Sequence, residues 1–203
     1  MGYKKLLGVL LAVLLALSSA KLYVRQVYDG DTVALSSGEH VRYLGVDAPE
    51  IDHKGGPSEL MALEAKAANA KLILGKPVRL EFDQERKDRH GRLLAYVFLE
   101  NGDMVNALLV KQGMARVFLQ PPNLKYFSLL LDSQRLAMAE KVGIWQKPVE
   151  QPEPYYVGNS NSYRFHRPGC PLGKTISGRH RVRFESSYKA SWEGYSPCRQ
   201  CKP

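Results

Sequence analysis

Cysteine is scarce in this chain and absent from most of it. Its three cysteines, Cys170, Cys198 and Cys201, all lie close to the C-terminus of the 203 residues. Thiol chemistry, whether a disulfide or a metal site, is therefore confined to that end of the chain.

Long apolar runs are also missing. The longest, residues 6–17, has twelve residues, which as a helix rise about 18 Å against a bilayer hydrocarbon core of roughly 30 Å. A multi-span membrane protein is excluded. With 44% hydrophobic and 24% charged residues, the composition is that of a globular protein, and the length fits one ordinary domain plus a small one.

The short apolar run belongs to a predicted export signal over residues 1–20. Lys4 and Lys5 precede it, and Ser18, Ser19 and Ala20 follow as the small residues that a signal peptidase accepts. We expect cleavage after Ala20 and a secreted or periplasmic location, with no stable membrane association after cleavage. An uncleaved membrane anchor is the alternative.

Acidic residues are fewer than basic residues, and most of the difference lies in one part of the chain. The chain has 20 acidic and 29 basic residues, a net charge of +9, so its natural partners are polyanions such as nucleic acid. Residues 21–146 carry 17 basic and 16 acidic residues, whereas residues 155–203 carry 9 and 2. Proline-rich residues 147–154 separate the two as a predicted extended linker. We therefore divide the mature chain into a barrel domain, residues 21–146, and a C-terminal module, residues 155–203.

Strand patterning predicts the barrel. Apolar residues flank Asp29-Gly30, a dipeptide typical of a tight hairpin whose central positions take positive φ. Further strands are predicted at residues 40–47, 77–82 and 92–99. The first of these, taken as one continuous strand, carries Arg42 and Asp47 on opposite faces.

Helical spacing predicts about three helices, over residues 57–74, 105–113 and 124–142. The apolar face of the first consists of Leu60, Leu63, Ala67, Ala70 and Leu74, and that of the last of Leu130, Leu131, Gln134, Ala137 and Met138. The predicted fold is α+β and mainly β: a five-stranded OB-type barrel with about three helices, plus the small C-terminal module.

Three charged clusters stand at the ends of predicted strands. They are Asp29 and Asp31 in DGDT, Asp47 and Glu50 in DAPE, and Asp88, Arg89, His90 and Arg92 in DRHGR. Singly, each is explained by turn or loop chemistry. Together they supply carboxylates for a hard divalent cation, two guanidinium groups for a phosphate and a carboxylate to activate water, which favours metal-assisted phosphodiester cleavage.

The barrel domain resembles the staphylococcal nuclease, or thermonuclease, family. The resemblance rests on DGDTVAL, VRYLGVDAPE, GKPVRLEFD, DRHGRLLAYVFL, GDMVNALLVKQGMARV and GIW, in order and at matching spacing. It implies an OB-fold nuclease that uses Ca²⁺ to hydrolyse DNA and RNA and leaves 3′-phosphate ends.

The resemblance also implies residue roles. Asp31 and Asp47 correspond to the carboxylate ligands of Ca²⁺, with the backbone carbonyl of Ala48 as a further ligand. Arg42 and Arg92 correspond to the arginines that bind the phosphate and stabilise the phosphorane-like transition state. Glu50 corresponds to the glutamate that activates water.

Two positions depart from the family pattern. Arg89 and His90 are expected to bind substrate, but His90 replaces the usual tyrosine of DRYGR or DKYGR, and imidazole still donates a hydrogen bond. After Ala115 the chain reads RVFL, which leaves the tyrosine that packs beside the nucleotide without an obvious counterpart.

The C-terminal module carries a metal-ligand pattern. His166, Cys170, Cys198 and Cys201 form H-x3-C-x27-C-x2-C, two close pairs separated by one long loop, as in structural zinc sites. A single disulfide with an odd thiol left over, or a surface role for His166, are the alternatives. We predict structural Zn²⁺, because about 50 residues hold too small a core to fold alone.

The same module resembles the zinc-binding domain of the Ada DNA-repair protein through FHRPGCP, RVRF and GYSPCRQC. That domain ligates zinc with four cysteines and uses the first as a methyl acceptor. His166 stands at the acceptor position, and imidazole is no such acceptor, so a structural or DNA-binding use is favoured over repair. The module's net +7 suits nonspecific binding to phosphates; a merely solvated basic face is the alternative.

The sequence therefore predicts an exported, calcium-dependent nuclease acting on DNA and RNA, with no protein partner inferred. Two alternatives belong to other classes. One is a non-catalytic nucleic-acid-binding protein that uses the OB fold and the basic module. The other is a zinc-dependent DNA-binding or repair protein that uses the barrel as a scaffold.

Overall fold

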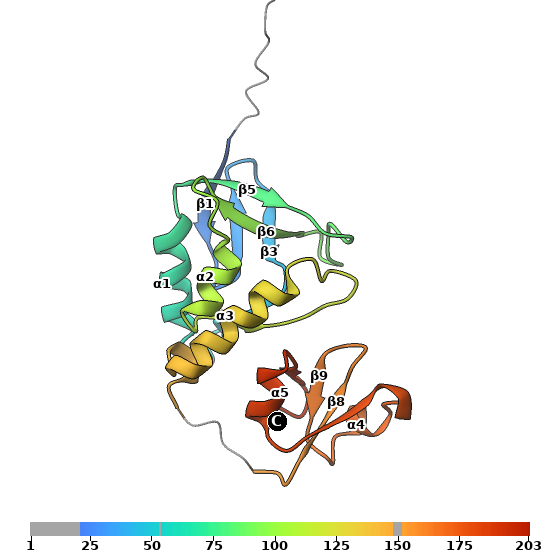
Figure 1. Cartoon of the computed structure of the whole chain (residues 1–203). Helices are drawn as coiled ribbons and strands as arrows, with labels where there is room; N and C mark the ends of the chain where they lie inside the picture. The colour runs from blue at the N-terminus through green and yellow to red at the C-terminus, as the bar shows by residue number, and fades with distance from the viewer. Residues whose placement is uncertain (1–20, 53, 148–151) are drawn as a thin grey trace, which may run out of the picture.

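A closed five-stranded barrel forms the first part of the chain. The computed structural model describes residues 21–52, 54–147 and 152–203 (Figure 1). Its barrel strands are β1 (Leu22–Val27), β2 (Thr32–Leu35), β3 (His40–Tyr43), β5 (Pro77–Glu81) and β6 (Leu93–Leu99), in the order β1-β2-β3-β6-β5. The predicted five-stranded barrel is thus confirmed. The predicted signal, residues 1–20, and much of the predicted linker lie outside the described residues.

The β1–β2 hairpin is present, but Gly30 serves it differently from the prediction. Gly30 does not take positive φ; instead, a Cβ atom added to it would lie 2.5 Å from the Cβ of Ala48 and 2.9 Å from that of Ala65. Glycine is needed here because the loop packs against two other segments. That close approach brings the DGDT loop next to the loop that follows Asp47.

The continuous strand predicted over residues 40–47 is wrong. β3 ends at Tyr43, Gly45 takes φ 75°, and β4 (Val46–Asp47) pairs instead with β7 (Arg116–Val117). The turn interrupts the strand, and it brings the side chains of Arg42 and Asp47 together, with Arg42 Nη2 3.0 Å from Asp47 Oδ1. Strand alternation therefore does not apply across this segment.

The first helix begins later than predicted and buries another face. α1 spans Ala62–Ile73 and buries Ala62, Ala65, Asn69 and Ile73. Leu60 and Leu63, placed on the apolar face by the prediction, are 69% and 65% exposed. Small residues are favoured at the interface because the DGDT loop packs closely against Ala65.

Two further helices complete the barrel domain. α2 spans Val105–Lys111 and α3 spans Phe127–Glu140. The predicted buried face of α3 is confirmed, with Leu130, Leu131, Gln134, Ala137 and Met138 all buried. A short 3-10 helix, η1 (Gly143–Trp145), follows. Across the described ranges, no helix combines the length and apolar character needed to cross a bilayer.

The C-terminal module is a small sheet with short helices. Its strands, in sheet order, are β10 (Arg181–Phe184), β8 (Tyr156–Asn159), β9 (Arg164–His166) and β11 (Ser196–Pro197). Its helices are α4 (Pro171–Lys174), η2 (Gly178–His180) and α5 (Ser187–Trp192). The buried cluster contains only Tyr156, Phe165, Phe184 and Ala190, which is a small core for a unit of this length.

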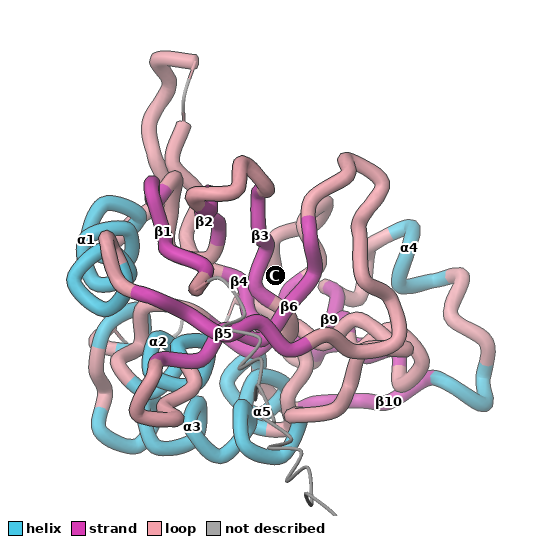
Figure 2. Tube along the Cα trace, turned by 90° about the horizontal axis from the view of Figure 1, so that it is seen from above, coloured by secondary structure: helices cyan, strands magenta, loops and turns pink. Residues whose placement is uncertain are grey.

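The module packs against the barrel domain through α3. Figures 1 and 2 both place α5 next to α3, and Figure 1 shows α3 between the barrel and the module. The buried side chain of Gln134 joins the two parts: its Oε1 accepts from the Val117 N–H at 2.7 Å, and its Nε2 donates to the Ser191 carbonyl at 2.6 Å. Arg135 Nε also donates to the Trp192 carbonyl at 3.1 Å.

Replacing Gln134 with Leu should destabilise the chain by about 1 to 3 kcal/mol, because it leaves the buried Val117 N–H without its partner. The Ser191 carbonyl loses the Gln134 amide but still accepts from the Gly194 N–H at 2.9 Å. Urea unfolding followed by tryptophan fluorescence measures the effect. Ser133→Ala is the matched control, since its Oγ bonds only within α3, to the Leu129 carbonyl at 2.8 Å. Equal losses in the two variants would contradict a joining role for Gln134.

Candidate active site

A cleft opens between the β3–β4 turn and the loop that precedes β6. Its volume is about 740 Å³, and its lining includes Arg42, Arg92, Arg89 and His90 together with Arg164 and Arg199 of the C-terminal module. An adjacent hollow of about 410 Å³ is lined by Asp47, Ala48, Glu50, Glu59, Arg116 and Arg199, among others. Two neighbouring hollows are therefore lined by the predicted arginines and by Asp47 and Glu50, and Asp31 lies beside them in contact with Arg42.

Asp31 is the most buried of these carboxylates, at 3% exposed. Its Oδ2 accepts from the Ala48 N–H at 2.7 Å, and its Oδ1 accepts from the Thr32 hydroxyl at 3.1 Å. Burial raises the pKa of Asp31 to about 7, although Arg42 opposes the shift. The negative charge of the buried Asp31 is therefore only partly balanced by Arg42, and a cation bound beside Asp31 would stabilise its ionised form.

Arg42 bridges the two predicted metal carboxylates. Its Nη1 lies 2.9 Å from Asp31 Oδ2 and its Nη2 lies 3.0 Å from Asp47 Oδ1. Nη1 also donates to the carbonyls of Tyr43 and Val46, at 3.1 and 2.9 Å. One positive group thus already lies between Asp31 and Asp47, and hard carboxylate oxygens with the adjacent Ala48 backbone fit the donor set that Ca²⁺ prefers.

Glu50 follows the metal carboxylates on an exposed loop. Its backbone N–H donates to Glu59 Oε2 at 3.1 Å, and its carbonyl accepts from the Glu59 N–H at 2.9 Å. Partial burial, with Asp29 and Asp47 nearby, raises the pKa of Glu50. The side chain is 57% exposed, so water reaches it freely, as a group that activates water requires.

Arg92 is held by Asp88, a member of the DRHGR cluster to which sequence reasoning assigned no individual role. Asp88 Oδ2 accepts from Arg92 Nε at 2.8 Å, and Asp88 Oδ1 accepts from the backbone N–H groups of Arg92 and His90, at 3.0 and 2.8 Å. Arg89 Nε contacts His90 Nε2 at 3.1 Å. Asp88 therefore orients the whole DRHGR loop at the mouth of the cleft.

Residues of the C-terminal module also reach the site, and sequence reasoning missed their placement. Arg199 Nη2 lies 2.7 Å from Asp47 Oδ1 and 3.8 Å from Glu50 Oε1. Arg164 lies over the Phe118 ring, 3.5 Å from its centroid, and donates to the Leu119 carbonyl at 2.9 Å. No local sequence signal reports these contacts, because they depend on how the two parts of the chain pack.

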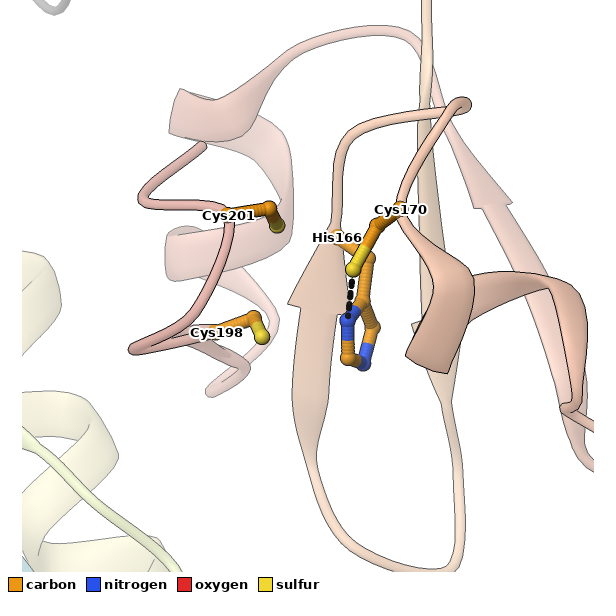
Figure 3. Close-up of side chains that lie close together, drawn as sticks. All are labelled: His166, Cys170, Cys198 and Cys201. Atoms are coloured by element: carbon orange, nitrogen blue, oxygen red, sulfur yellow. Dashed lines mark hydrogen bonds between the residues drawn. The ribbon is translucent and has the colours of Figure 1, made fainter.

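The predicted zinc ligands form one cluster in the module. The ligand atoms of His166, Cys170, Cys198 and Cys201 all lie within 4.8 Å of one another. Figure 3 shows the four side chains gathered from β9, the start of α4 and the turn after β11. His166 Nδ1 is 3.5 Å from Cys170 Sγ, and the three cysteines are free.

This donor set fits zinc. Three thiol sulfurs and one imidazole nitrogen are its preferred ligands, and tetrahedral zinc at about 2.3 Å from sulfur spaces its ligand atoms about 3.8 Å apart. The cluster is also largely buried, with Cys201 alone partly accessible. A closed site of this kind is typical of structural rather than catalytic zinc.

Comparisons with known proteins agree with the barrel-domain geometry. A family model described as "Staphylococcal nuclease homologue" matches residues 40–147. The chain is 39% identical over 127 residues to a thermonuclease of Staphylococcus intermedius, covering 61% of this chain and 75% of the relative. It is 37% identical to a thermonuclease of Staphylococcus hyicus, covering 60% and 73%.

A third relative is the endonuclease YncB of Bacillus subtilis, which is 36% identical over 124 residues and covers 59% of this chain and 58% of the relative. The family match ends at residue 147, so it does not extend into the C-terminal module. The likeness of that module to the Ada zinc-binding domain stays a prediction, although its ligand cluster is present.

Proposed function

Because this chain belongs to the family of staphylococcal nuclease homologues, we propose that it is an exported, calcium-dependent nuclease that hydrolyses DNA and RNA to 3′-phosphate ends. One observation carries the proposal: Arg42 makes ion pairs with both Asp31 and Asp47, and it lines a cleft with Arg92 next to the hollow that Asp47 and Glu50 line. Relatives called thermonuclease and endonuclease support the nuclease assignment.

Asp31, Asp47 and the Ala48 carbonyl would hold Ca²⁺, which when bound neutralises phosphate charge so that an anionic nucleophile can approach. The buried Asp31 is fixed by the Ala48 N–H and the Thr32 hydroxyl, so the oxygen ligands are positioned before any cation arrives. Arg42 lies against the same carboxylates and adjoins the position of a phosphate bound there.

Glu50 takes the proton from the attacking water. Because its pKa is raised, this carboxylate is a stronger base than an ordinary glutamate. Arg42 and Arg92 hold the non-bridging phosphate oxygens, where negative charge increases as the nucleophile adds. The planar guanidinium of Arg92 is oriented by Asp88, so it is aimed at the substrate in advance.

The C-terminal module binds structural Zn²⁺ in this proposal and adds a basic surface for the nucleic-acid backbone. Its four-ligand cluster supports the zinc assignment, and its net +7 supports backbone binding. Export rests on the sequence of residues 1–20, which predicts secretion or a periplasmic location.

Cleavage assays on the mature chain test the proposal. Single-stranded DNA, duplex DNA and RNA are incubated with Ca²⁺ or with chelator, and the product ends are identified by mass spectrometry. We expect Ca²⁺-dependent cutting with 3′-phosphate ends, and a loss of about 3 kcal/mol of transition-state stabilisation in Arg42→Ala, the scale for one preorganised donor. Binding without cutting under every divalent metal would instead support a non-catalytic nucleic-acid-binding protein.

A further inference from the structure

The C-terminal module places one guanidinium in the nuclease site. Arg199 lies in the turn between the cluster cysteines Cys198 and Cys201, and it lines both the large cleft and the hollow that contains Asp47 and Glu50. It makes an ion pair with Asp47 across 152 positions of the chain. This ion pair joins the two parts of the chain, so it depends on the packing of the module against the barrel domain.

We propose that Arg199 is a substrate-positioning residue of this nuclease, which binds a backbone phosphate of the nucleic-acid strand in the cleft. The proposal rests on the proposed nuclease function and extends it to a residue outside the family match, which ends at residue 147. The ligand class is a phosphodiester oxygen, because a planar fork of N–H donors is the geometry that phosphate accepts bidentately.

The Arg199 guanidinium has N–H donors that its carboxylate contacts do not use. Both of its carboxylate contacts, to Asp47 Oδ1 and Glu50 Oε1, use Nη2, whereas an arginine carries five N–H donors. Asp47 Oδ1 also accepts from Arg42 Nη2, so Asp47 does not depend on Arg199 for a partner. The Arg199 side chain is 66% exposed, which leaves it accessible to a strand that enters the cleft.

The backbone that carries Arg199 is held firmly. The Cys198 N–H donates to the Phe165 carbonyl and the Lys202 N–H donates to the Cys198 carbonyl, both at 2.9 Å. On the barrel side, the Phe118 ring contacts both Arg164 and Arg199, whose guanidinium carbons lie 3.5 and 5.3 Å from the ring centroid. Ordering a side chain on such a support costs less on binding than ordering one on a free tail.

The charges around Arg199 favour a polyanion. The same cleft is lined by further basic residues, namely Arg42, Arg86, Lys87, Arg89, Arg92 and Arg164. Arg199 therefore extends a basic path from the barrel domain onto the module. A strand whose scissile phosphate lies at Arg42 and Arg92 would have a neighbouring phosphate within the part of the cleft that Arg199 lines.

The test compares Arg199→Ala and Arg199→Lys with Arg179→Ala, which removes the same charge from an exposed position in η2 of the same module. KM and kcat are measured on single-stranded DNA with Ca²⁺. Dissociation constants are measured by fluorescence anisotropy with a labelled oligonucleotide at several salt concentrations, in a Glu50→Gln background whose cutting is slow on the time scale of the measurement. Zinc content and circular dichroism verify that every variant is folded.

We expect Arg199→Ala to raise KM and the dissociation constant about tenfold or more, the scale for a hydrogen bond to a charged group, with kcat nearly unchanged. The salt dependence of binding should weaken by about 0.7 in log–log slope, as for one phosphate contact on a single strand. Arg199→Lys should retain the slope but bind more weakly than wild type. Arg179→Ala should change KM much less.

Equal losses in Arg199→Ala and Arg179→Ala would overturn the proposal in favour of a diffuse basic field. Unchanged DNA affinity together with tighter Ca²⁺ binding in Arg199→Ala would also overturn it, because Arg199 would then only compete with the cation for Asp47. If the wild-type chain fails to cut at all, the proposed nuclease function fails, while the binding comparison still tests Arg199 independently.

Discussion

Replacing Glu50 with Gln should lower kcat by about 10² to 10⁴, the usual contribution of a positioned general base. The amide keeps the shape of the side chain but cannot accept the proton of the attacking water. Substrate affinity should remain close to wild type, because Arg42, Arg92 and the carboxylates Asp31 and Asp47 are untouched. Single-turnover cleavage and oligonucleotide binding measure the two quantities separately.

Glu59→Gln is the matched control. Glu59 is an exposed carboxylate on the same loop, and its Oε2 accepts from the Glu50 N–H at 3.1 Å. An amide oxygen can still accept that hydrogen bond, so the control changes charge without removing the support of Glu50. A kcat within threefold of wild type in Glu50→Gln would assign water activation to another group.

The pH dependence of kcat/KM gives an independent measure of the same residue. The pKa of Glu50 is raised by partial burial and then by Asp29 and Asp47, with Arg42 and Arg199 opposing. A base acts only when ionised, so the activity should fall as the pH decreases through this raised pKa. The acid limb due to Glu50 should therefore lie above the ordinary glutamate value. Its contribution should be missing from the small residual activity of Glu50→Gln, where any remaining acid limb would belong to another group such as Asp31.

The residue types of the site were predictable because the chemistry is carried by short motifs. Asp31, Glu50 and Arg92 stand in loops that follow or precede strands, and Asp47 ends the short strand β4. Strand alternation located the barrel strands well enough to predict that these residues lie at strand ends. What local pattern did not predict is the turn at Gly45, whose positive φ places Arg42 and Asp47 together. Alternation of side chains along a strand does not predict a turn within residues 40–47.

The error at α1 and the unpredicted position of Arg199 have a related cause. Hydrophobicity favoured Leu60 and Leu63 for the core, but the close approach of Gly30 and Ala48 leaves room only for small side chains such as Ala65. The position of Arg199 depends on Gln134 and Arg164, which join two parts of the chain that are separated by a linker. Packing between distant segments decides both outcomes, and neither is encoded in residue spacing.

Removing a zinc ligand should have the largest effect on structure. In Cys170→Ser or His166→Ala, we expect bound zinc to fall from about one equivalent to near zero and the C-terminal module to unfold. The apparent binding free energy of structural zinc is about 10 to 16 kcal/mol in small domains, which the four-residue core of Tyr156, Phe165, Phe184 and Ala190 does not replace. Metal analysis and hydrogen exchange of residues 155–203 measure the two losses.

His180→Ala is the control, because His180 lies in the same module but bonds to Ser160 Oγ at 3.3 Å, outside the cluster. Its zinc content should match wild type. The barrel domain should keep its fold in the ligand variants, since its own core lies in the β1-β2-β3-β6-β5 barrel and α1 to α3. A module that stays protected without metal, with two cysteines shown by mass spectrometry to be disulfide-linked, would contradict the zinc assignment.

The same variants separate the two metals that the proposed function requires. Loss of zinc releases the turn that carries Arg199 but leaves Asp31, Asp47 and Glu50 in place, so cutting should persist with Ca²⁺ at a raised KM. Loss of Ca²⁺ should abolish cutting while hydrogen-exchange protection of the module stays unchanged. A ligand variant with undetectable cutting and an intact barrel would mean that the module contributes to the chemical step, and that Arg199 or a neighbour acts on the reacting phosphate itself.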